Sequence, residues 1–268
     1  MSDDSISEFD RLKKNLSLVA FYMNELHERL LALALFMNHD REKRILALYQ
    51  RSLAWIRTLT VLDKTTYLQA IVASTRALLE TTIDIVLMHH DKTTNSSEKM
   101  EAWEESGKLK AAEALISYFR RSKKPIPDLY SQLVSFVDKN QSIILNERNI
   151  HWPCTKGKHP ERWTGSSSLL DDIRIVDKSE KSIFEIELGF CLEEFYEAMF
   201  RPLCWNIHGS ALGGIRGLNA NGFHSIICTS YKWSSDLSML GAKYVIAEIG
   251  QPQFLQEWDV VNKERNRF

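Results

Sequence analysis

Two side chains late in the sequence, Arg201 and His208, have the types and the spacing for phosphate chemistry without a metal ion. They are seven residues apart, close to two helical turns, so both project from one face if a helix persists that far. A guanidinium binds phosphate, and an imidazole transfers protons near neutral pH. The structural alternative is that Arg201 caps a surface and His208 ends a helix before Gly209, where a cation suits the helix dipole.

A second group of charged residues lies in a stretch, residues 63–90, that is apolar on almost all sides. Arg76, Glu80 and Asp84 follow one another at intervals of four. Ionised groups in a core must be paired or functional. We therefore expect Arg76 and Glu80 to be buried as a charged pair near His151, either anchoring neighbouring helices or orienting a catalytic histidine.

Basic and aromatic residues alternate between residues 146 and 168, where helical periodicity disappears. Such a mixture suits phosphates and stacked bases. His151, beside Trp152, is a further functional candidate, whereas Trp152 and Trp163 are expected mainly to cover the helical core. The residues predicted to contact RNA are Arg148, Lys156, Lys158 and Arg162.

The elements that must position these groups are helical. Apolar residues recur at three- and four-residue spacing along most of the chain, and strand patterns are nearly absent. We predict an all-α fold, a single bundle of about seven helices over residues 1–250, with a tail from 251 to 268 that is loosely ordered or packs on a partner. The expected helices cover about residues 5–30, 40–60, 63–90, 97–121, 128–145, 179–208 and 221–248.

Composition and motifs exclude several classes of function. The net charge of −1 provides no general attraction for nucleic acid, so RNA must meet a local basic patch. The four cysteines are scattered, and no Glu-x-x-His pairs suit a di-metal bundle, so neither metal nor cofactor is expected. Neither a phosphate-binding loop nor a GxSxG elbow occurs. Without a signal peptide or a membrane-spanning run, we expect a cytoplasmic protein.

These motifs together resemble the HEPN (higher eukaryotes and prokaryotes nucleotide-binding) superfamily. The Arg201-x6-His208 motif in an all-α chain carries the likeness. More narrowly, the chain resembles an uncharacterised helical bacterial family related to abortive-infection proteins, over roughly residues 65–245. That likeness rests on Arg76-x3-Glu80, His151-Trp152, Trp163-Thr164-Gly165 and the run from Tyr196 to His208-Gly209-Ser210.

The resemblance implies a metal-independent endoribonuclease, a toxin or defence effector that works as a homodimer. His208 is then the general base or acid and Arg201 the phosphate clamp. Pro202 departs from the family pattern, which has a polar residue there, and a proline removes an amide donor and kinks a helix. Asn206 is a candidate replacement for that polar partner. The alternative is a non-catalytic helical module that binds a nucleotide or a partner protein of the same defence or toxin–antitoxin system.

Overall fold

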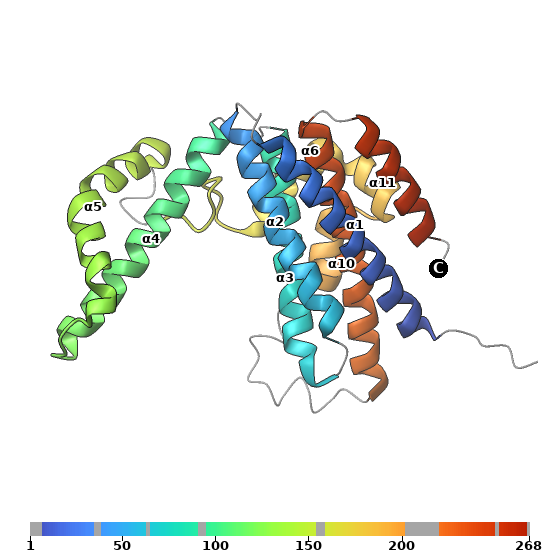
Figure 1. Cartoon of the computed structure of the whole chain (residues 1–268), viewed down its shortest axis with the longest axis horizontal. Coiled ribbons are helices and arrows are strands. Elements are labelled where there is room, and N and C mark those ends of the chain that lie inside the picture. Colours follow the sequence, from blue (N-terminus) through green and yellow to red (C-terminus); the bar gives the residue numbers. More distant parts are fainter. Residues whose placement is uncertain are drawn as a thin grey trace, which may run out of the picture. The chain divides into compact units, whose positions relative to one another are not determined.

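The computed structural model describes residues 7–34, 39–62, 65–90, 95–153, 159–201, 220–249 and 252–266. Within these ranges the regular structure is entirely helical, which confirms the predicted all-α class (Figure 1). The described ranges contain nine α-helices rather than about seven, because one predicted helix is divided by a turn and the predicted tail contains another.

The helices have the following bounds: α1 Glu8–Ala34, α2 Asp40–Val61, α3 Leu68–His89, α4 Ser96–Arg121, α5 Ser131–His151, α6 Leu169–Leu188, α7 Leu192–Phe195, α10 Ala220–Ile249 and α11 Pro252–Arg265. Short 3-10 segments, η1 (Thr65–Tyr67) and η2 (Asp128–Tyr130), precede α3 and α5. A π-helical segment, η4 (Tyr196–Phe200), continues α7.

The chain divides into two compact units, residues 1–92 with 173–268 and residues 93–172, whereas a single bundle was predicted from the sequence. The division has a physical cause in the helix patterns. Helix α3 buries residues on nearly every side, whereas α5 buries Ile144 alone among its 21 residues. A helix with so little buried surface does not belong to a central core.

In the larger unit, α3 lies against α2 and α10, and α1 packs on α2 and α10 (Figure 1). Small polar side chains let α3 approach α10 closely. Thr75 and Ser234 share a hydrogen bond of 3.0 Å between their hydroxyl oxygens, and the Thr82 hydroxyl donates to the Leu237 carbonyl at 3.2 Å. The prediction that residues 63–90 form a central helix is confirmed.

The segment predicted to be a tail forms helix α11, which packs against α1 and α10. Trp258 is buried and donates its indole N–H to the Met239 carbonyl at 2.7 Å. Buried Arg265 pairs with Asp236. These contacts join residues that are far apart in the sequence. The pattern of apolar residues within 251–268 therefore could not predict them.

In the smaller unit, α4 and α5 pack side by side as a helical hairpin. Residues 159–168 fold over one side of it, with Trp163 only 1% exposed. The Trp103 indole donates to the Pro160 carbonyl at 2.9 Å, and the Trp103 ring stacks on His159. The prediction that Trp152 and Trp163 cover a helical core is confirmed, since both are buried.

None of the described helices is long and apolar enough to cross a membrane. Cys191 and Cys228 are buried free thiols, and Cys154 and Cys204 lie outside the described residues.

Candidate functional site

The predicted Arg76–Glu80 pair exists on α3, but it is not buried. The Arg76 Nε donates to the Glu80 Oε1 at 2.8 Å, and the two side chains are 37% and 34% exposed. The pair occupies the edge of α3 that the packing against α2 and α10 leaves partly open, so the expectation of full burial was wrong. A half-exposed pair retains water at both charges, and its rupture costs less than that of a buried pair.

A turn and a cap at residues 189–193 set the path of the chain toward Arg201. Gly189, with φ of 79°, ends α6 in a conformation that suits glycine. The Asp177 carboxylate on α6 accepts the backbone N–H groups of Leu192 at 3.1 Å and Glu193 at 2.7 Å. The predicted helix over residues 179–208 is thus interrupted here, because these bonds restart a helix in a new direction.

Aromatic packing fixes α7 and the turn before it on α10. The Trp233 ring lies 4.1 Å from that of Phe190 and 4.6 Å from that of Phe195, between ring centroids. Tyr196 stacks on Phe200 within η4. Phe195 and Phe200 are buried, so both rings pack in the core of the larger unit.

Arg201 is exposed directly after η4. Its Nη1 donates to the Glu197 Oε2 at 2.9 Å, one turn earlier, and both side chains are more than 40% exposed. The Arg76 guanidinium carbon lies 5.5 Å from the centroid of the Phe200 ring. The structure therefore brings the Arg76–Glu80 pair to the segment that carries Arg201. Pro202, Asn206 and His208 lie outside the described residues.

His151 and Arg148 lie on helix α5 rather than in a loop. The helix continues to His151 and ends because Pro153 disfavours helical backbone at Trp152, which has φ of −135° and ψ of 67°. The His151 Nε2 lies 4.0 Å from the Glu147 Oε2, and its side chain is 12% exposed. This histidine lies in the smaller unit.

The predicted RNA-contacting residues have unequal positions. Arg148 is half-buried in a pocket that Lys110, Glu113 and His159 also line. Arg162 is only 14% exposed and donates its Nε to the Asp172 Oδ2 at 2.7 Å. Lys156 and Lys158 lie outside the described residues.

Asp172 organises the loop in which Arg162 lies. Its fully buried carboxylate also accepts the hydroxyl groups of Thr164 at 2.7 Å and Ser166 at 2.6 Å. A buried carboxylate needs several donors to offset its lost hydration. The Arg162 guanidinium therefore stabilises the folded loop, a role that its position in a basic stretch did not indicate.

A buried charged cluster between α2, α3 and α10 was not predicted from the sequence. The Glu248 side chain is 6% exposed and accepts hydrogen bonds from the Arg41 Nε at 2.7 Å and the His89 ring at 2.8 Å. Burial alone raises the pKa of Glu248, but the bonds from His89 and Arg41 outweigh it, so the pKa is lowered. Nearby, the His90 Nε2 lies 3.4 Å from Glu180.

A sequence signal for this cluster is the pair His89-His90 at the end of the apolar stretch of residues 63–90. In the part of the chain that the structure describes, no group of three or more His, Cys, Asp or Glu side chains is placed to hold a metal ion.

Comparison with known families assigns the chain to one of them. A family described as "Family of unknown function (DUF5677)" matches residues 42–222. The chain belongs to this family. The matched range contains every residue predicted for the candidate site, from Arg76 to His208. No curated protein and no solved structure matches the chain.

Proposed function

We propose that this protein is a metal-independent endoribonuclease of the HEPN type, with Arg201 as the phosphate clamp and His208 as the general base or acid. The observation that supports it is the position of Arg201. Its exposed guanidinium follows a firmly anchored helical segment, and that segment also contacts the Arg76–Glu80 pair on α3. A second guanidinium thus lies beside the segment that carries the first.

The carboxylates that neutralise these two arginines do not prevent phosphate binding. Arg201 pairs with Glu197 and Arg76 with Glu80, and all four side chains are about a third or more exposed. Exposed ion pairs of this kind contribute about 0–1 kcal/mol, so a phosphate can replace Glu197 at little cost. A guanidinium then offers two parallel N–H donors to the phosphate oxygens.

In the proposed reaction, His208 takes the proton of an RNA 2′-hydroxyl, and that oxygen attacks the adjacent phosphorus. Arg201 stabilises the negative charge that develops on the phosphorane, and the 5′ oxygen of the next nucleotide leaves with a proton that water supplies. The products are a 2′,3′-cyclic phosphate and a 5′-hydroxyl. Asn206 supplies a polar contact that Pro202 cannot, and the Arg76–Glu80 pair positions the Arg201 segment. The protein acts in the cytoplasm and restrains growth of its cell when active.

The test is cleavage of RNA by purified protein with a chelator present, read by the cyclic phosphate end. His208→Ala should abolish cleavage, and Arg201→Lys should lose most of the rate, because lysine keeps the charge but not the fork of donors. Arg174→Lys is the matched control, since Arg174 is also exposed and pairs with Glu193 at 2.8 Å. Cleavage that survives in His208→Ala, or that stops with chelator, contradicts the mechanism.

The second candidate function is a non-catalytic module that binds a nucleotide or a partner protein. The Arg201–Glu197 ion pair favours it, because a clamp already neutralised by its own helix suits a surface that recognises rather than turns over its ligand. If the wild-type protein binds RNA or a mononucleotide, but leaves the RNA intact, this second function replaces the first.

A further inference from the structure

The larger unit contains a pocket of about 250 Å³ between α1, α10 and α11. Its lining residues come from the first two turns of α1, the middle of α10 and the last turn of α11. All nine of them lie outside residues 42–222, the range that matches the family, and none belongs to the site of the proposed function. The pocket is therefore a feature that neither the family nor the proposed function explains.

One wall of the pocket is a buried network of ion pairs and hydrogen bonds. The Asp236 carboxylate on α10 accepts hydrogen bonds from the Arg265 guanidinium on α11 and, at 3.2 Å, from the Lys232 Nζ. The Asn15 Nδ2 on α1 donates to the Arg265 carbonyl oxygen at 2.9 Å. Asp236 and Arg265 are both buried, so the chain itself fixes the walls of the pocket.

Three polar groups of the lining residues have no hydrogen-bond partner in the part of the chain that the structure describes. They are the Arg11 guanidinium, the Asn15 Oδ1 and the Ser235 hydroxyl. Ser235 is only 4% exposed. A buried polar group without a partner is unfavourable, and in native proteins nearly all such groups bond a protein group or a bound molecule. These three groups are thus available to a ligand.

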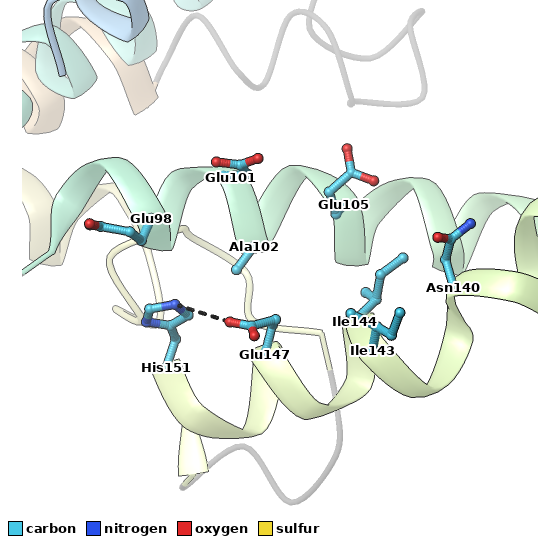
Figure 2. A pocket seen from close by; sticks show the side chains of 9 residues that line it. All are labelled: Glu98, Glu101, Ala102, Glu105, Asn140, Ile143, Ile144, Glu147 and His151. Carbon is cyan, nitrogen blue, oxygen red and sulfur yellow. Dashed lines mark ion pairs between the residues drawn. The ribbon is translucent and has the colours of Figure 1, made fainter. Parts of the chain in front are cut away.

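The charge of the pocket favours an anion. Three cationic side chains and two carboxylates line it, and Asp236 is already bonded to two of the cations. Arg11 is the third cation, and the second carboxylate, Glu8, is exposed and therefore hydrated. The larger groove between α4 and α5, of about 370 Å³, is the opposite case, with four glutamates and neither lysine nor arginine among its lining residues (Figure 2). Charge rather than size distinguishes the two cavities.

A phosphate group matches the available contacts. A guanidinium offers two parallel N–H donors to phosphate oxygens, and a serine hydroxyl offers a third donor. The Asn15 Oδ1 is an acceptor, so it matches a hydroxyl group of the ligand rather than an anionic oxygen. The pocket has room for roughly eight groups of the size of water. That space suits a phosphate with a few further atoms and is too small to enclose a polynucleotide.

We propose that this pocket binds the phosphate group of a small molecule, either inorganic phosphate or the phosphate ester of a small polyol. Arg11 and Ser235 donate hydrogen bonds to the phosphate oxygens, and Lys232 adds positive charge beside them. The inference goes beyond the proposed function, because none of these residues takes part in it and the test requires no RNA.

The test is isothermal titration calorimetry of the full chain at constant ionic strength, with inorganic phosphate, glycerol phosphate and acetate as ligands. The wild type should bind at least one of the two phosphates with a Kd of about 1 mM or below, and acetate at least about tenfold more weakly, because acetate has fewer oxygens and less charge. Tighter binding of glycerol phosphate identifies the ester as the ligand class. Tighter binding of inorganic phosphate identifies the free ion.

Two variants with matched controls test the contacts. Arg11→Gln should weaken phosphate binding at least about tenfold, since a hydrogen bond to a charged group is lost. Arg51→Gln, at an exposed arginine of α2 outside the pocket, should bind like the wild type. Ser235→Ala should weaken binding at least about threefold without lowering the thermal midpoint of the ligand-free protein, because its hydroxyl bonds no protein group. Ser230→Ala removes a similar buried hydroxyl of α10 outside the pocket and should not change binding.

Three results would overturn the proposal. The first is that neither phosphate binds saturably up to about 10 mM, and the second is that acetate binds as tightly as the phosphates. The third is that Arg11→Gln or Ser235→Ala binds phosphate like its control variant. Circular dichroism verifies that each variant is folded. None of these results bears on RNA cleavage.

Discussion

Replacing Glu248 with glutamine removes a carboxylate that the structure places, 6% exposed, between Arg41 on α2 and His89 on α3. Glutamine has nearly the same shape and can still accept one hydrogen bond. The change therefore removes the negative charge from a buried position while disturbing the packing of α10 very little. What it tests is whether this cluster stabilises the junction of three helices.

The magnitude follows from the exposure of the partners. Breaking a buried ion pair costs about 3 to 5 kcal/mol when the remaining charge stays buried. Here Arg41 is 42% exposed and His89 is 21% exposed, so water partly replaces the lost carboxylate. We expect a loss of about 2 to 3 kcal/mol, or about 5–10 °C in the thermal midpoint for a chain of this size.

Glu80→Gln is the matched comparison. Glu80 also bonds an arginine at 2.8 Å, but it is 34% exposed, and its partner Arg76 is 37% exposed. Exposed pairs contribute about 0–1 kcal/mol, so Glu80→Gln should lower the midpoint by less than about 3 °C. This expectation replaces the cost of about 3 to 5 kcal/mol that burial of the pair would have implied.

The assay is thermal and urea unfolding of both variants at pH 7, repeated in acid. The lowered pKa of Glu248 means that its contribution is present above its ordinary pKa of 4.5 and is lost as the pH falls through the folded-state value. The wild type and Glu248→Gln should therefore converge in acid. Equal thermal midpoints for Glu248→Gln and Glu80→Gln at pH 7 would refute the reasoning. So would a difference in stability between the wild type and Glu248→Gln that persists in acid.

Two further predictions concern the smaller unit and the turn after α6. Gly165→Ala should lower the free energy of unfolding by about 1 to 3 kcal/mol, because φ is 87° and the new Cβ would lie 2.8 Å from the Trp152 Cδ1. Gly189→Ala is the control, since Gly189 has a similar φ of 79° but open space around it, and it should lower the free energy of unfolding less. Equal losses for the two variants would exclude the clash with Trp152 as the cause. Burial, with Lys110 and Arg148 nearby, lowers the pKa of His159, so the unfolded chain binds its proton first and stability falls as the pH drops below about 6.5. His159→Gln should flatten the fall of the thermal midpoint between pH 7 and pH 5, and an unchanged slope would contradict it.

Elements with a strong, continuous pattern were predictable. The expected helix over residues 63–90 is present as α3, because its apolar residues on all sides require a central position whatever surrounds it. The expected helices over residues 40–60, 97–121 and 221–248 correspond to α2, α4 and α10 within a few residues. Local periodicity also distinguished α5 from the neighbouring helices. It did not predict that α5 continues to His151, since the expected helix ended at about residue 145.

Elements that depend on distant contacts were not predictable in the same way. The turn at Gly189 and the restart at Leu192 are set by Asp177, which lies on the preceding helix and offered no local signal. Helix α11 is held by Trp258 and Arg265 against α10, and its weak periodicity looked like a tail.

The sequence by itself determined the all-α class, the central helix and the residue types available for phosphate chemistry, because helical periodicity and side-chain chemistry are local properties. Only the tertiary structure decided the environment of each charge. In the structure the Arg76–Glu80 pair is about a third exposed, and Arg162 forms an ion pair with the buried Asp172. Glu248 is buried between Arg41 and His89. Whether a charged side chain is buried depends on which helices pack against it. That packing is decided by many contacts between residues far apart in the chain, and no single stretch of sequence contains them.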